Sequence, residues 1–176
     1  MTALVVFESM YGSTKAVAEA IGAGLAGSGP VRVIEVGTFA AAPGSRKLSD
    51  DITLLVVGGP THAFGLSRSS TRADAAKEAK AGVVSTGKGI REWLGDLTMP
   101  TGGLPVATFD TKVLKPNLPG SAAKGAEKAL RQLGGRPVAP PRSFRVHGKS
   151  DGLVDGELEA ARAWGQQLGA SRIRER

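Results

Sequence analysis

The sequence contains no cysteine among its 176 residues. A disulfide framework, a thiolate metal site and a cysteine nucleophile are therefore excluded. Histidine is also scarce, because His62 and His147 lie far apart and no cluster of carboxylates accompanies either of them. A structural or catalytic metal needs several such ligands close together, so we expect no metal centre.

Long apolar runs and aromatic side chains are few as well. No segment approaches the roughly 20 apolar residues of a membrane-spanning helix, and no basic-then-apolar leader precedes the first predicted strand. We therefore expect a cytoplasmic protein without a membrane partner. Aromatic residues make up 5% of the chain, and no run interleaves them with basic residues, which argues against nucleic-acid binding.

The net charge is nevertheless +7, with a pI near 10.1. We interpret this charge as dispersed, apart from the basic tail with Arg172, Arg174 and Arg176. A dispersed positive charge is typical of a soluble surface or of a protein with an acidic partner.

The most informative stretch of the chain is an apolar run followed by a short loop rich in hydroxyl groups. Val5, Val6 and Phe7 predict a buried strand, the loop runs from Ser9 to Thr14, and 14–27 predicts a helix. The first N–H groups of such a helix have no partner within it and carry the positive end of its dipole. With the hydroxyls of the loop they predict a phosphate-binding site. Ser and Thr are also ordinary helix caps, so the loop alone leaves a purely structural role open.

Strands and helices alternate along the rest of the chain. Further strands are predicted at 31–36, 52–59, 104–109 and 136–146, the last only at a sheet edge because it contains three prolines. Further helices are predicted at 71–82, 89–97 and 121–133 and after Asp155. This alternation indicates an α/β fold, a doubly wound five-stranded parallel sheet in a three-layer α/β/α arrangement. We expect one domain at 1–170 and a tail at 171–176.

In such sheets, ligands bind beyond the carboxyl ends of the strands where the strand order reverses. Three loops follow strands one, three and four: the first loop, the loop with Pro60, Thr61, His62 and Phe64, and a lysine- and proline-rich loop at 110–120. The second and third loops are less specific than the first.

The order of these elements and the first loop resemble the flavodoxin-like family. Ser9, Gly12 and Thr14 stand where its phosphate loop has Ser or Thr, Gly and Thr. The resemblance implies the strand order 2-1-3-4-5 and a non-covalent flavin mononucleotide (FMN) that transfers electrons to a redox partner protein. It also implies the contacts of the flavin: the phosphate with Ser9, Met10, Tyr11, Gly12, Ser13 and Thr14, and the ring or ribityl chain with Pro60, Thr61, His62, Phe64, Phe109, Asp110 and Thr111.

The sequence departs from that family at two points. Flavodoxins commonly hold the ring between a tryptophan in the second loop and a tyrosine in the third, and this chain has neither there. They are also strongly acidic, whereas this protein is basic. His62 or Phe64 would give a smaller stacking surface, which implies weaker retention of the flavin.

Several other functions fit parts of the sequence. The run 82–88 has the glycine and lysine spacing of a P-loop, but Gly89 stands where Ser or Thr should hold magnesium, and we interpret it as a chance match. A phosphorelay receiver is excluded, because the acidic residues that it needs are missing. Two alternatives stay open: a non-redox binding module that has lost the flavin, and an FMN-dependent NAD(P)H or quinone oxidoreductase with His62 as proton donor.

Overall fold

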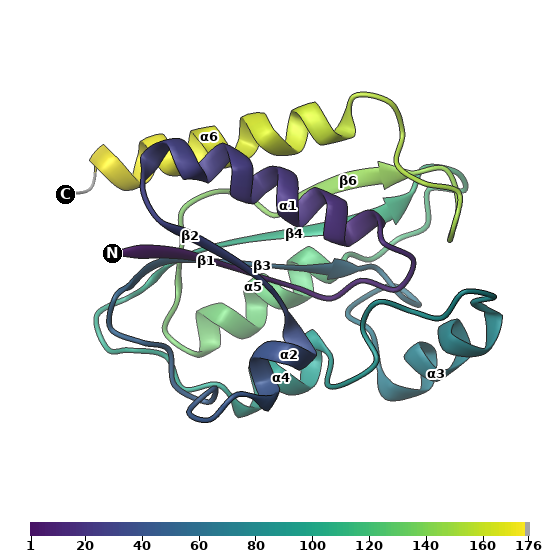
Figure 1. The fold of residues 1–176 in the computed structure, drawn as a ribbon, viewed down its shortest axis with the longest axis horizontal. Helices are drawn as coiled ribbons and strands as arrows, with labels where there is room; N and C mark the ends of the chain where they lie inside the picture. Colours follow the sequence, from purple (N-terminus) through teal and green to yellow (C-terminus); the bar gives the residue numbers. More distant parts are fainter. Residues whose placement is uncertain (175–176) are drawn as a thin grey trace.

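The computed structural model describes the backbone of residues 1–174 and the side chains of residues 1–171. Its centre is a parallel sheet with the strand order β2-β1-β3-β4-β5, to which β6 is added by pairing with β4 (Figure 1). The predicted fold class and strand order are thus confirmed. The strands are β1 (Thr2–Phe7), β2 (Val31–Glu35), β3 (Ile52–Pro60), β4 (Pro105–Val113), β5 (Arg136–Pro137) and β6 (Arg142–Val146).

Helices cover both faces of this sheet (Figure 1). They are α1 (Ser13–Leu25), α2 (Val36–Ala41), α3 (Ser69–Glu78), α4 (Ile90–Asp96), α5 (Ala122–Gln132) and α6 (Glu157–Arg174), with a short 3-10 turn η1 (Ala26–Ser28) after α1. Within residues 1–174, no helix is long and apolar enough to span a membrane. Helix α6 includes 171–174 of the expected basic tail, whereas 175–176 lie outside the described residues.

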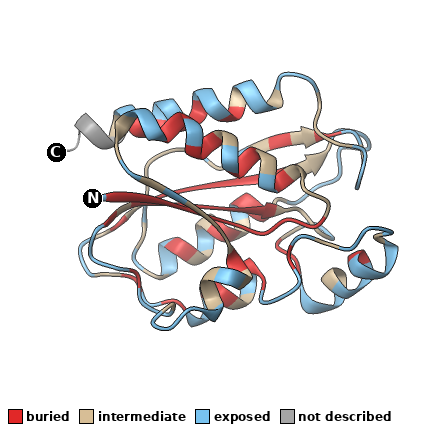
Figure 2. Cartoon of the chain, viewed as in Figure 1, coloured by how far each residue is buried: buried red, intermediate tan, exposed pale blue. Residues whose placement is uncertain are grey.

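The central strands β1 and β3 are apolar along nearly their whole length because both of their faces are covered. One core lies between the sheet and helices α1 and α6, and includes Ile21 and Trp164. The other lies between the sheet and helices α2, α4 and α5, and includes Trp93 and Leu130. Figure 2 shows the buried strands in red between helices that are exposed on their outer sides.

Three boundaries differ from the sequence-based expectation. Strand β2 ends at Glu35, and the helix α2 begins at Val36, where Glu35 accepts a hydrogen bond from the Thr38 N–H (2.8 Å). Strand β4 continues to Val113, so Asp110 and Thr111 lie in a strand and not in a loop. The predicted fifth strand is split into β5 and β6, because Pro140 and Pro141 between them have no N–H for the ladder.

Glycine residues allow helices α1 and α6 to pack closely against each other. A Cβ added at Gly24 would overlap the carbonyl oxygen of Arg162, and one added at Gly165 would overlap that of Ile21. The two backbones therefore touch directly. This close approach fixes the direction of α1, whose N-terminus points to the carboxyl edge of the sheet (Figure 1).

Candidate functional site

A cavity of about 400 Å³ lies at the carboxyl ends of β1, β3 and β4, between the loops that the sequence singles out. From the first loop it is lined by Met10, Tyr11, Ser13 and Thr14. From the other predicted positions it is lined by Pro60, Thr61, His62 and Thr111. The structure thus brings these eight residues together at one place, where parallel α/β sheets bind their ligands.

Ser9 and Gly12 shape the first loop and do not line the cavity. The Ser9 side chain is fully buried, and its hydroxyl accepts a hydrogen bond from the Gly12 N–H (3.1 Å). Gly12 has φ +99°, in the left-handed region that favours glycine. This turn sends the chain directly into α1.

Phe64, Phe109 and Asp110 are not brought to the cavity either. Phe64 is 58% exposed at the tip of the second loop. Phe109 is fully buried beneath α1 and α6, with its ring centroid 6.3 Å from that of Phe144. It lies inside β4, short of the carboxyl end of the strand, on the face of the sheet that α1 and α6 cover.

Asp110 has a structural role at the start of α5. Its Oδ2 accepts hydrogen bonds from the Ala123 N–H (3.0 Å), the Ser121 hydroxyl (2.5 Å) and the Thr61 hydroxyl (3.0 Å). Thr61 in turn accepts from the Ala122 N–H (2.9 Å). These bonds position the second loop against α5.

The N-terminus of α1 forms one wall of the cavity. The Ala16 N–H is the first to bond back within the helix, to the Gly12 carbonyl (3.0 Å), so the preceding amides of Ser13, Thr14 and Lys15 point out of the helix end. Within the described residues no side chain caps this end, and the first turn holds no acidic residue. The helix dipole and the free amides make it a place of positive potential.

Thr14 links this helix end to β4. Its Oγ1 lies 2.8 Å from Oγ1 of Thr111, and both side chains are buried. Whichever hydroxyl donates in this pair, the other keeps its own hydrogen for another acceptor.

Hydrogen bonds join the first loop to the run 82–88, whose sequence we interpret as a chance P-loop match. The Ser9 N–H donates to the Ser85 hydroxyl (3.0 Å), and the Ser85 N–H donates to the Ser9 carbonyl (2.8 Å). The Val84 N–H also donates to the Met10 carbonyl (2.9 Å). Lys88, the lysine of this P-loop-like run, forms an ion pair with Asp96 of α4.

Helix α3 covers one side of the cavity, a role that its polar sequence did not reveal. Asp74, Ala75 and Glu78 line the cavity from this helix. The Tyr11 hydroxyl donates to the Ala75 carbonyl (3.3 Å), and Glu78 pairs with Lys149 across the opening (3.0 Å). Ala75 is the buried residue of α3, and these contacts help to hold the helix over the cavity.

His62 is partly buried in the cavity wall. Its burial lowers the pKa of the imidazole, and the positive charges of Arg72 and Lys149 lower it further. Since the ordinary value is about 6.5, His62 is a neutral imidazole at pH 7. It can accept or donate a hydrogen bond there but carries no charge.

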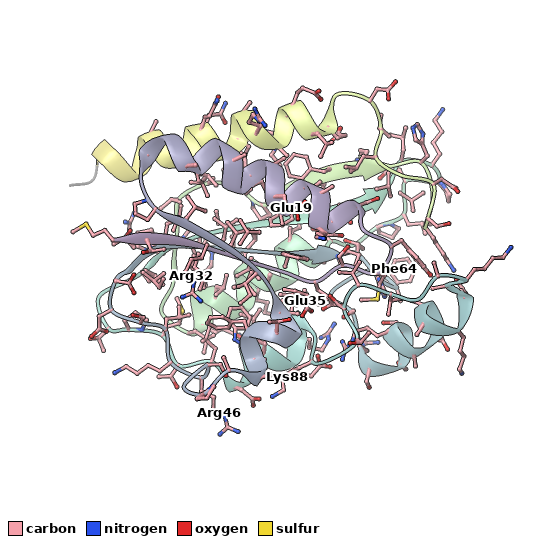
Figure 3. All side chains as sticks on the ribbon, viewed as in Figure 1. Glu19, Arg32, Glu35, Arg46, Phe64 and Lys88 are labelled. Atoms are coloured by element: carbon pink, nitrogen blue, oxygen red, sulfur yellow. The ribbon has the colours of Figure 1, made fainter. Side chains whose placement is uncertain are left out.

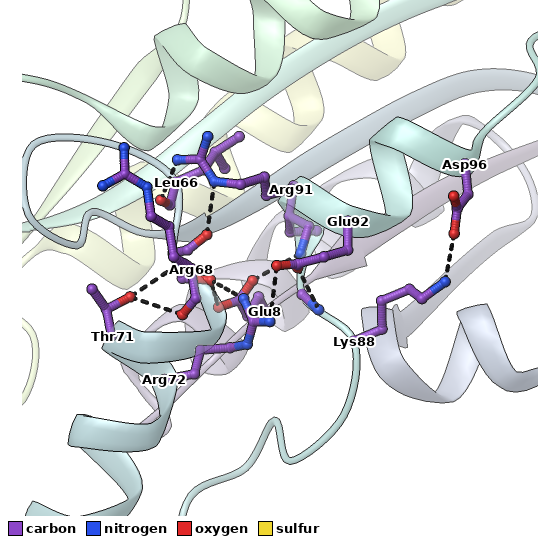
Figure 4. A network of polar contacts seen from close by, with 12 residues as sticks. Glu8, Leu66, Arg68, Thr71, Arg72, Lys88, Arg91, Glu92 and Asp96 are labelled. Atoms are coloured by element: carbon purple, nitrogen blue, oxygen red, sulfur yellow. Dashed lines mark hydrogen bonds and ion pairs between the residues drawn. The ribbon is translucent and has the colours of Figure 1, made fainter.

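A buried carboxylate, Glu8, connects β1 to α3 and α4 (Figure 4). It is 1% exposed, accepts from the Ser67 hydroxyl, and accepts from the Ile90 N–H (2.8 Å). Arg72 donates to the Ser67 hydroxyl (2.8 Å) and pairs with Glu92 (3.1 Å). Burial raises the pKa of Glu8, although these hydrogen bonds and the charge of Arg72 oppose the rise.

The raised pKa of Glu8 leads to a testable pH dependence. A carboxyl whose pKa is raised on folding contributes stability that is full below the ordinary value of about 4.3 and is lost as the pH rises through the folded pKa. We therefore expect the wild type to lose free energy of unfolding relative to Glu8→Gln as the pH is raised from 4 to 8. Urea unfolding at a series of pH values measures this difference.

Glu19→Gln is the matched control, because Glu19 is 58% exposed on α1. Its difference from the wild type should change little with pH. A Glu8→Gln difference that is equally flat would contradict the description of Glu8 as a buried carboxylate with a raised pKa.

Known proteins resemble this chain in structure but not in sequence. No family model matches the chain, and no curated protein matches it in sequence. It is similar in structure to a flavodoxin from the domain Archaea (TM-score 0.64, 19% identity, 98% of this chain and 99% of that one). It is also similar to oxidised Flavodoxin 1 from Bacillus cereus (TM-score 0.65, 15% identity, 99% and 98%).

A third similar structure is larger. The chain matches the Flv1 flavodiiron core from Synechocystis sp. PCC6803 with a TM-score of 0.64 and 13% identity, and spans 37% of the length of that protein. At these identities the similarities establish architecture and not chemistry. Together with the observed strand order, they show that the chain has the flavodoxin-like fold.

Proposed function

We propose that the protein binds FMN non-covalently at this cavity and carries electrons to a partner protein. The observation that carries the proposal is the uncapped N-terminus of the 13-residue helix α1 in the wall of a 400 Å³ cavity. A cavity of this volume lies within the range of about 300–1,000 Å³ that is typical of small-molecule sites. The flavodoxins among the similar structures point in the same direction.

The residues at the helix end fit a phosphate group. The amides of Ser13, Thr14 and Lys15 and the hydroxyl of Ser13 would hold it, and the dipole of α1 would favour its negative charge. Gly12 leaves this end open, because nothing lies within 4 Å of a Cβ built there. The Thr14 and Thr111 hydroxyl pair supplies one further hydrogen for an acceptor.

The rest of the cavity fits a flat, largely apolar ring. Met10, Tyr11, Ala63 and Leu118 line it together with the neutral imidazole of His62. When bound, the flavin supplies one- and two-electron redox chemistry. The side chains of the protein bind and orient the ring, while α3 excludes water from one side of it.

The state of His62 disfavours its predicted role as the proton donor of an enzyme. A proton donor works best with a pKa near the working pH, whereas the pKa of His62 is lowered by burial. A neutral imidazole suits a hydrogen-bonding wall better than an acid catalyst. The open alternative of an NAD(P)H or quinone oxidoreductase is therefore the less favoured proposal in the form that uses His62 as its proton donor.

Titration of the apoprotein with FMN tests the proposal. We expect quenching of the flavin fluorescence that saturates at one flavin per chain, and slow steady-state oxidation of NAD(P)H by the complex. Absence of quenching would leave a non-redox binding module as the function. Rapid turnover of NAD(P)H would identify an enzyme in place of a carrier.

A further inference from the structure

The positive charge of the protein is concentrated in one part of the chain, contrary to the interpretation of a dispersed charge. Residues 111–150 contain nine of the 23 Lys and Arg residues but only Glu127 of the 16 acidic ones. The remainder of the chain has 14 basic and 15 acidic residues and is therefore nearly neutral. The net charge of +7 thus comes from this segment.

The basic segment lies on the side of the sheet where β5 and β6 pair with β4, and it ends beside the cavity. It comprises the end of β4, the loop 114–121, helix α5, strands β5 and β6, and the turn after β6 (Figure 1). Among its cations, Arg131 forms an ion pair with Glu127, and Lys149 forms one with Glu78. Within the described residues, Lys112, Lys115 and Arg145 form no ion pair; Lys112 donates to carbonyl oxygens, and Arg145 lies 3.4 Å from the Asn117 amide oxygen.

Exposed apolar side chains lie at the cavity end of this segment. Phe64 is 58% exposed, Leu118 53% and Leu114 39%. The loops that carry them touch, because a Cβ added at Gly120 would overlap the carbonyl of Phe64. Leu118 and Ala63 also line the same cavity. We call these three apolar residues and the cations Lys112, Lys115 and Arg145 the docking patch.

The docking patch is held in a fixed shape. Lys112 donates to the carbonyls of Leu118 (3.1 Å) and Gly120 (2.6 Å), which ties the loop to β4. The turn at Phe64 is closed by two hydrogen bonds between His62 and Gly65 (2.8 and 2.9 Å). A surface that is ordered before binding loses less conformational entropy when a partner docks.

We propose that the docking patch binds an acidic protein partner, which presents carboxylates around an apolar centre beside the opening of the cavity. Opposite charges steer such a partner to this edge of the molecule, and the exposed Phe64 and Leu118 supply apolar area at the centre of the contact. The proposal rests on the proposed function in one respect, namely that docking at this place would bring a redox partner close to the flavin.

Nucleic acid is the other class of polyanion that a basic surface attracts. Single-stranded nucleic acid is bound by a positively charged groove with several aromatic side chains for successive bases. The docking patch has one aromatic ring, Phe64, and two leucines in its centre. Its composition is that of a protein interface with an apolar centre and a charged rim.

The test is a nuclear magnetic resonance titration of the ¹⁵N-labelled protein, with and without FMN, using a short capped peptide of alternating glutamate and leucine. We expect shift changes concentrated at 62–65 and 112–120, and an affinity that falls as salt is added. A glutamine and leucine peptide should cause much smaller changes. Binding is read from the protein itself, so the result is clear whether or not the protein binds FMN.

Two matched charge-reversal variants make the test specific. Lys115→Glu/Arg145→Glu should weaken peptide binding by at least ~10-fold, whereas Arg46→Glu/Lys47→Glu, with the same change in net charge, should change it by less than about 2-fold. Arg46 lies far from Phe64 in the molecule (Figure 3). Equal effects of the two variants would overturn the proposal, as would shift changes that are absent or located elsewhere. Tighter binding of a single-stranded oligonucleotide than of the peptide at these residues would overturn it as well.

Discussion

Replacing Ser13 with aspartate is expected to weaken FMN binding strongly without destabilising the apoprotein. Ser13 lies in the cavity wall at the first position of α1. A carboxylate there places negative charge where the phosphate would bind, and like charges in contact cost several kcal/mol at an effective dielectric constant near 20. We expect the dissociation constant to rise by at least ~100-fold, which corresponds to about 2.7 kcal/mol.

The same substitution should leave the free energy of unfolding of the apoprotein unchanged or raise it slightly. An acidic residue in the first turn of a helix interacts favourably with the dipole, by about 0.3–1 kcal/mol. Urea unfolding of the apoprotein should therefore show an equal or slightly higher free energy of unfolding. Ser13→Asn, of similar size but uncharged, is the control and should keep the affinity within about 5-fold. If Ser13→Asp bound FMN as tightly as Ser13→Asn does, the phosphate would not lie at this helix end.

The second large effect is expected where α1 and α6 touch. Gly165→Ala should lower the free energy of unfolding by roughly 3 kcal/mol, the upper end of the usual cost of overpacking. The new methyl group would overlap the carbonyl of Ile21, and a backbone oxygen in a helix cannot move aside as a side chain can. Gly24→Ala, which faces the Arg162 carbonyl, should have a similar effect.

Gly95→Ala serves as the control for this pair. Gly95 is in α4 and exposed, and nothing lies within 4 Å of a Cβ built there. Alanine is favoured over glycine in helices by about 0.5–1 kcal/mol, so this variant should be as stable as the wild type or more stable. A thermal or urea unfolding series measures all three. If Gly165→Ala were as stable as Gly95→Ala, the direct backbone contact between α1 and α6 would be wrong.

The parts of the molecule that depend on local pattern could be predicted from the sequence. The apolar runs of β1 and β3 and the hydroxyl-rich loop before α1 indicated a parallel sheet and a strand exit with free amides. The structure shows this sheet and this helix end. The resemblance to flavodoxins supplied the strand order, which local periodicity does not contain.

The parts that depend on contacts between distant residues could not be predicted. Glu8 is joined to Ser67 and Ile90, which are 59 and 82 positions away, and nothing near Glu8 in the sequence indicates these partners. The role of α3 as a cavity wall likewise follows from its contacts with Tyr11 and Lys149. Its own sequence is polar and shows no buried stripe.

Phe109 shows why a strand boundary matters for a site. An end of the strand at 109 would have placed this ring at the edge of the sheet, in reach of a ligand. Because β4 continues to Val113, Phe109 lies inside the core and Thr111 reaches the cavity instead. The apolar and polar residues at 104–113 do not alternate strictly, so the sequence did not fix this end.

The claim that the N-terminus of α1 binds the phosphate is tested most directly by comparing FMN with riboflavin, which has the same ring and side chain but no phosphate. The dissociation constants are obtained by fluorescence quenching under identical conditions on the wild type and on Ser13→Asp. We expect the wild type to bind FMN at least ~100-fold more tightly than riboflavin, and Ser13→Asp to lose this preference. Equal affinity of the wild type for the two compounds would contradict the claim.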